Sequence, residues 1–191
     1  MSSELKDPPA SPKSFKWSSD KVVSMSAIFI SLMTLITFVH QNRLLQKQAA
    51  LSVLPYLSIT TAYTVSSKPS FRLKIINRGV GPAIIESQEV SYDGKVYKDD
   101  FIEFLNEQIP GFDSLQNIAQ SNLVFGSVLP SGEDLDIIGV YSDINEVNLI
   151  AAKLQELNDS GMKYKVVYRS IYGERWMITE SSDLPIVLPK L

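Results

Sequence analysis

The chain has 191 residues, no cysteine, one histidine and a formal net charge of −3. The missing cysteines exclude disulfides, thiolate metal sites and cysteine nucleophiles, and His40 lies beside an apolar run, so the rest of the chain has no imidazole for general-base catalysis or metal binding. Residues 55–191 carry 12 basic and 18 acidic side chains, a net charge of −6, which argues against nucleic-acid binding and against lying flat on anionic lipid.

The N-terminal segment, residues 1–21, is rich in serine, proline and lysine. Such a composition buries too little apolar surface to fold and predicts a disordered tail. Trp17 suits the headgroup level of a membrane, where amphipathic aromatic rings are common.

An uncharged run, VVSMSAIFISLMTLITFV, follows over residues 22–39. As a helix it is roughly 27 Å long, close to the ~30 Å hydrocarbon core of a bilayer. A buried helix of a soluble protein usually carries charge on one face, and a cleavable signal peptide has a shorter apolar region before a small-residue cleavage site. We therefore expect an uncleaved transmembrane helix. Its defining residues are Val22, Ala27, Ile28, Phe29, Ile30, Leu32, Leu35 and Val39.

The basic residues around this run predict its direction. Four lysines precede it, whereas only Arg43 and Lys47 follow it closely. By the positive-inside rule the N-terminus lies in the cytoplasm and the C-terminal domain lies outside. The expected localisation is the cell membrane, crossed once. A small, hydroxylated stripe of Ser24, Ala27, Ser31 and Thr34 suits close packing of membrane helices, although chance placement explains it at least as well.

Residues 40–54 contain no glycine and consist mostly of strong helix formers until the end of the segment, so the membrane helix is expected to continue as a stalk. Pro55 ends it, because the residue before a proline is disfavoured in the helical region. Residues 55–191 then form one folded domain.

This domain is rich in β-branched and aromatic residues, and its apolar residues alternate with polar ones at a period of 2, which predicts strands. Helical spacing interrupts it over 99–118, with Asp99 or Asp100 as a cap, and over 143–158. Asp93-Gly94 predicts a tight hairpin. The pattern is typical of a mainly β fold with inserted helices, an antiparallel β-sandwich. The predicted strands are 55–63, 70–77, 83–92, 95–98, 121–129, 134–141, 162–171 and 174–180.

One glycine-rich motif contains Asn77, Gly79, Gly81 and Pro82. It resembles a phosphate loop superficially, but such a loop leads into a helix, and β-branched residues follow here. We interpret the motif as a structural turn or bulge in which Asn77 and the glycines adopt positive φ.

Four aromatic residues recur every fourth position: Tyr164, Tyr168, Tyr172 and Trp176. In a strand this spacing places them on one face, where they either pack in the core or form an interaction patch. Two acidic groups are also present and are interpreted as solvated surface: Asp99, Asp100, Glu103 and Glu107, and Glu133, Asp134 and Asp136. The spacing and glycine of a calcium loop are missing, so neither metal nor cofactor is expected.

Three ordered elements carry a resemblance to known proteins. They are KIINRGVGPAII around Asn77, LPSGE at residues 129–133, and YRSIYGERW at residues 168–176. Together with the N-terminal span they resemble uncharacterised bacterial single-pass membrane-anchored proteins with an immunoglobulin-like β-sandwich ectodomain. The resemblance implies that fold and an anchor. It implies no activity, and no catalytic residue is carried over.

The absence of cysteine, of a histidine beyond His40 and of a nucleotide-binding motif favours a non-catalytic interaction or structural module anchored in the bilayer. Its expected partner is a membrane or envelope protein or a second copy of the chain. An extracytoplasmic sensor or ligand-binding domain that signals through a partner remains the alternative. A carboxylate-based hydrolase would require two facing acids in a cleft, which a sequence does not reveal.

Overall fold

The structure is a computed structural model that describes residues 18–98, 100–115, 117–121, 123–179, 182 and 184–190. The predictions made for residues 1–17, including Trp17, and for Asp99 lie outside these described residues. The chain divides into two compact units, Met1–Gln46 and Lys47–Leu191.

The first helix, α1, runs without a break over Ser19–Ser52 and is long and apolar enough to cross a membrane. None of its residues is buried. Hydroxyl groups of α1 bond back along the helix: Ser24 Oγ donates to the Asp20 carbonyl at 2.8 Å and Thr34 Oγ1 to the Ile30 carbonyl at 2.8 Å. These bonds satisfy hydroxyls that would otherwise be costly in an apolar environment. The predicted helical continuation beyond residue 39 is confirmed as far as Ser52.

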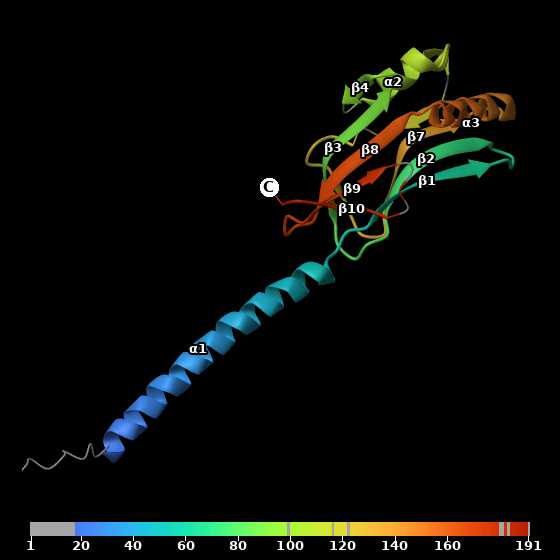
Figure 1. The fold of residues 1–191 in the computed structure, drawn as a ribbon. Coiled ribbons are helices and arrows are strands. Elements are labelled where there is room, and N and C mark those ends of the chain that lie inside the picture. The colour runs from blue at the N-terminus through green and yellow to red at the C-terminus, as the bar shows by residue number, and fades with distance from the viewer. Residues whose placement is uncertain are drawn as a thin grey trace, which may run out of the picture. The chain divides into compact units, whose positions relative to one another are not determined.

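The second unit contains two antiparallel sheets (Figure 1). The first has the strand order β1-β2-β7-β5, and the second has the order β10-β9-β8-β3-β4, with β6 also paired to β3. The strands of the first sheet are β1 (Leu57–Thr64), β2 (Ser70–Asn77), β5 (Ile118–Gln120) and β7 (Asp134–Tyr141). The strands of the second are β3 (Ala83–Tyr92), β4 (Lys95–Lys98), β6 (Val128–Leu129), β8 (Lys163–Arg169), β9 (Arg175–Thr179) and β10 (Ile186–Leu188).

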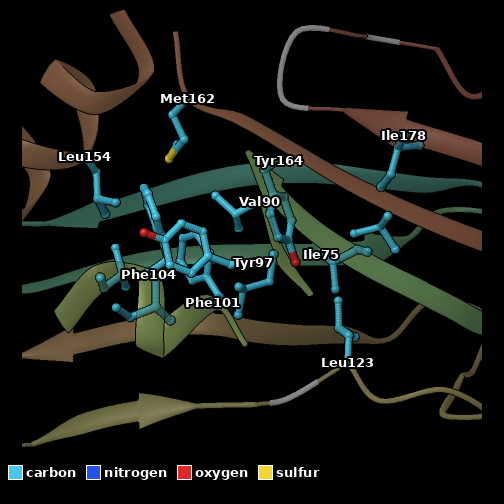
Figure 2. Packing of buried hydrophobic residues seen from close by; sticks show 14 of the residues in the cluster. Ile75, Val90, Tyr97, Phe101, Phe104, Leu123, Leu154, Met162, Tyr164 and Ile178 are labelled. Carbon is cyan, nitrogen blue, oxygen red and sulfur yellow. The ribbon is translucent and has the colours of Figure 1, made fainter. Parts of the chain in front are cut away.

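Alternating side chains from the two sheets meet in one apolar core. Ile75 of β2 and Ile85 of β3 are fully buried, and Tyr164 of β8 is nearly so. Figure 2 shows Tyr164 among these core side chains, and its ring lies 5.3 Å from that of Phe101. The opposite faces of the strands carry ion pairs, such as Arg72 with Asp136 at 2.8 Å. This division of apolar and polar faces is what period-2 strands of a sandwich produce.

The turn between β3 and β4 is formed by the two residues that the sequence predicts, Asp93 and Gly94. Asp93 and Gly94 have φ values of 46° and 76°, and Tyr92 pairs with Lys95 across the turn. Positive φ at both central residues is typical of a two-residue hairpin loop, so the predicted hairpin is confirmed.

Two helices interrupt the strands. The short helix α2 (Phe101–Gln108) is capped by Asp100, whose carboxylate accepts from the Glu103 N–H at 2.8 Å. It contacts β3 and β4, and the 3₁₀ turn η1 (Phe112–Ser114) follows. The longer α3 (Ile144–Asp159) contacts β2 and β7 (Figure 1), and Asp143 caps it through the N–H groups of Asn145 and Glu146. The helix predicted over 143–158 is confirmed, whereas the helical spacing predicted over 99–118 forms α2 only as far as Gln108, and Ile118–Gln120 form the strand β5.

The prediction of individual strands was wrong in two further places. Residues 121–129 do not form one strand: β5 ends at Gln120, and only Val128–Leu129 pair again, with β3. Leu123 is buried there, whereas Phe125 is 76% exposed, so apolar residues in this stretch do not alternate between two faces. The strand β10 was missed because it has only three residues, lies between two prolines and forms an edge.

Candidate functional site

The glycine-rich motif fastens the start of the folded unit. Asn77 is completely buried, and its amide makes four hydrogen bonds. The Oδ1 atom accepts from the N–H groups of Tyr56 and Gly79 at 3.2 and 3.0 Å, and Nδ2 donates to the carbonyls of Gly81 and Leu129 at 2.8 and 3.0 Å. One side chain therefore joins the segment before β1, the motif itself and the end of β6.

The glycines of the motif serve a different purpose from the predicted one. Gly79, Gly81 and Asn77 are not among the residues with positive φ, so that part of the interpretation was wrong. A Cβ on Gly79 would lie 2.4 Å from the Leu54 carbonyl oxygen, and a Cβ on Gly81 would lie 1.9 Å from the Val53 carbonyl oxygen. Glycine is required because the backbone of the preceding segment passes directly over the motif.

These contacts also decide against a phosphate loop. The backbone N–H groups of Arg78, Val80 and Gly81 bond to the carbonyls of Tyr56 and Leu54, and the Gly79 N–H bonds to Asn77. No N–H in this run is directed at a ligand. Pro82 is half-buried and leads into β3 instead of a helix. The motif therefore has a structural role, and we call residues 77–82 together with the segment 53–57 that they hold the structural joint.

The other two elements of the resemblance meet at the same joint. Ser131 Oγ donates to the Gly79 carbonyl at 2.5 Å, and the Asn77 N–H donates to the Glu133 carbonyl at 3.0 Å. The Leu57 N–H donates to the Tyr168 hydroxyl at 3.3 Å. The glycine-rich motif and Tyr168 therefore hold the residues through which the chain enters β1, and the stretch at residues 129–133 holds the motif.

The four regularly spaced aromatic residues do not lie on one exposed face. Tyr164, Tyr168 and Trp176 are 2%, 0% and 8% exposed, and only Tyr172 is largely exposed, at 49%. The Tyr168 and Trp176 rings stack with centroids 5.7 Å apart, since these residues pair across β8 and β9. Burial raises the pKa of Tyr168 to about 12. Core packing, and not an exposed patch, accounts for three of the four.

One carboxylate in each acidic group is paired with a neighbouring lysine. Glu107 accepts from Lys95 at 2.7 Å and from the Tyr97 hydroxyl at 2.5 Å, and the Lys95 bond is the main reason that the pKa of Glu107 lies below its usual value. Asp134 bonds to Lys74 at 2.9 Å, which lowers its pKa in the same way. In the parts of the chain that the structure describes, no three acidic or histidine side chains gather as a metal site would require.

The surface of the second unit contains a groove of about 550 Å³ between β1, β2, α3 and the start of β8. Its floor is apolar and includes Phe71, Leu73 and Leu154. Figure 2 shows Leu154 and Met162 beside the core, where α3 and β8 approach it. The volume lies within the range of ligand-binding pockets.

One wall of this groove is β1. Leu57 is buried at the start of the strand, whereas Thr61 and Tyr63, on the same face, are exposed. This face of β1 is therefore buried in the sandwich at Leu57 and lines the groove further along the strand. Tyr63 donates from its hydroxyl to the Asn148 side chain of α3, which closes one end. No charged residue lines the groove within the described chain.

The sequence did not reveal the groove, because five separate segments contribute to it and none carries a recognisable motif. Its clearest signal was the uncharged stretch from Ser58 to Thr64, in which hydroxyl-bearing residues occupy positions of both faces. Comparisons of the chain with protein-family models, with curated proteins and with solved structures give no match.

Proposed function

We propose that this chain is a non-catalytic binding module anchored in a membrane, and that its second unit binds a protein of the cell envelope. In this proposal α1 crosses the bilayer once, the N-terminus lies in the cytoplasm and the second unit lies outside. The observation that carries it is the open, uncharged groove beside β1, in a unit whose Asp134 and Glu107 are paired with lysines and whose glycine-rich loop is a structural joint.

An immunoglobulin-like relationship is part of the proposal, and the strand order supports it. Immunoglobulin sandwiches have the sheets A-B-E-D and G-F-C, with C′ added in some domains. The order β1-β2-β7-β5 corresponds to A-B-E-D, and β9-β8-β3-β4 corresponds to G-F-C-C′. On this assignment α2 and α3 are insertions in the C′–D and E–F connections, and β10 is an additional strand beside G.

Crosslinking in intact membranes tests the function. The full-length chain is crosslinked in its native membrane, purified under denaturing conditions and examined for a stoichiometric protein partner. One defined partner is the expected result. A chain that crosslinks to nothing and remains a monomer would overturn the proposal.

A sensor is the second candidate, because β1 both lines the groove and follows the anchor helix after only four residues, 53–56. A ligand in the groove would contact a strand that is directly connected to the membrane helix. If the chain has no protein partner and a small apolar molecule raises its melting temperature, this candidate would be favoured over the first.

Orientation is tested independently, since the chain has no native cysteine. Lys68→Cys places a thiol in the exposed loop between β1 and β2. A membrane-impermeant maleimide should label it in intact cells, while Ser11→Cys in the N-terminal segment should react only after permeabilisation. The opposite pattern would reverse the topology.

A further inference from the structure

The edges of the two sheets are not protected to the same degree. Proteins usually shield exposed sheet edges with short strands, lysine, proline or bulges, because the unpaired backbone groups otherwise bind other strands. Among the described residues, β5 and β10 have three residues each, β10 is flanked by Pro185 and Pro189, and β4 begins and ends with lysine. By contrast, β1 has eight residues, no charge and no proline, and it pairs with β2 without a register shift.

Hydrogen bonds at the start of β1 show which of its backbone groups face outward. The Arg78 N–H donates to the Tyr56 carbonyl at 2.7 Å, whereas the Leu57 N–H points the other way, to the Tyr168 hydroxyl at 3.3 Å. Alternate residues of an antiparallel strand bond to opposite sides. The regular register therefore directs the N–H and C=O groups of Ile59, Thr61 and Tyr63 away from β2.

The same three residues line the groove. A strand laid along β1 would bond to their outward backbone groups, and every second side chain of that strand would face the apolar floor at Phe71 and Leu73. A small molecule would fill the groove without using this edge. The coincidence of an unprotected edge with an adjoining apolar groove is therefore specific to an extended peptide.

We propose that β1 accepts an extended segment of the partner protein as an added strand, and this inference rests on the proposed function. The floor of the groove at Phe71 and Leu73 is apolar, so the inward side chains of the segment are apolar. Residues 55–191 carry a net charge of −6, which favours basic residues at the ends of the segment through electrostatic steering. A second copy of the chain has the same negative charge and fits this chemistry less well.

The test uses the full-length chain in lipid nanodiscs and a blocked peptide of sequence Lys-Val-Thr-Val-Thr-Val-Lys as the probe. Hydrogen exchange is followed at the backbone amides of β1. The peptide should slow exchange at Ile59, Thr61 and Tyr63. Protection confined to another element, or none with peptide in large excess, would overturn the inference.

Two proline variants sharpen the result. Thr61→Pro removes an outward N–H and obstructs the edge, yet proline is tolerated where the N–H does not join the ladder. Val65→Pro, beyond the end of β1, is the matched control. Thr61→Pro should weaken peptide binding at least about tenfold, and Val65→Pro by less than about twofold. Thermal unfolding of both variants verifies that they fold.

The natural partner separates this inference from the proposed function. A partner captured by crosslinking that binds Thr61→Pro as tightly as the parent chain would refute strand addition and leave the binding module standing. A chain with no protein partner would refute the function itself. Dimerisation through β1, detected by sedimentation and abolished by Thr61→Pro, would assign the edge to a second copy and refute the proposed partner.

Discussion

Replacing Asn77 with alanine should destabilise the second unit more than any other single polar change at the joint. The buried amide makes four hydrogen bonds, and its loss leaves the carbonyls of Gly81 and Leu129 without that donor. At about 1 kcal/mol net for each bond, and more where a buried group stays unsatisfied, the cost is about 3–5 kcal/mol. That is a large fraction of the usual 5–15 kcal/mol of a domain and corresponds to a fall in Tm of about 10–15 °C.

Urea unfolding of the full chain in detergent measures this cost. Trp176 is the reporter, because it is buried against Tyr168, and Trp17→Phe removes the only other tryptophan. Arg78→Ala, at the exposed neighbouring position, should cost less than about 1 kcal/mol. A free energy of unfolding for Asn77→Ala within about 1 kcal/mol of the parent would refute the role given to the amide.

Asn77→Asp tests the donors separately from the acceptors. The introduced carboxylate could still accept from Tyr56 and Gly79, but it would face two carbonyl oxygens in place of donating to them. Burial and these carbonyls should raise its pKa in the folded state. The folded variant then binds the extra proton more tightly, so its stability should fall as pH rises through that pKa. Equal stability of the variant and the parent at every pH would contradict this.

Three further predictions concern neighbouring contacts. Gly81→Ala should cost more than about 3 kcal/mol in thermal unfolding, because its Cβ would lie 1.9 Å from the Val53 carbonyl oxygen; a smaller cost would mean that the joint yields easily. Tyr168 has a pKa raised to about 12, so the parent should lose stability between about pH 10 and pH 12, and Tyr168→Phe should reduce that loss in alkaline unfolding. Lys95→Met should raise the pKa of Glu107 toward its ordinary value, as measured by carboxyl NMR, since the Lys95 hydrogen bond is the chief cause of its depression; an unchanged titration would show that the pair does not form in solution.

Strands were predictable wherever a period of 2 coincided with one buried face. In β2 the alternation of Phe71, Leu73 and Ile75 with charged neighbours gave the correct bounds, and the Asp93-Gly94 turn fixed the next hairpin. The strand predicted over 121–129, around Phe125, did not form, because local propensity does not determine whether an apolar stretch has a neighbouring strand to pair with. Edge strands such as β10 give the weakest signal of all.

The site was less predictable than the fold. Gly79 and Gly81 look like turn glycines in sequence, and only the path of residues 53–56 over them reveals that lack of space is the reason. The spacing of Tyr164 and Tyr168 correctly indicated a shared face, but not whether that face was inside or outside. The groove depends on segments brought together by the complete fold, which no local pattern encodes.

The joint around Asn77 also determines how mechanical load would enter the second unit. If α1 is an anchor, as proposed, any pull along it reaches the unit through residues 53–57. These residues are held by backbone bonds to the glycine-rich loop, by the Asn77 amide and by the Tyr168 hydroxyl. These bonds would have to break before the pull reached the pairing of β1 with β2. The motif that resembles a phosphate-binding loop in sequence would, under such a load, protect the first strand of the folded unit from unfolding.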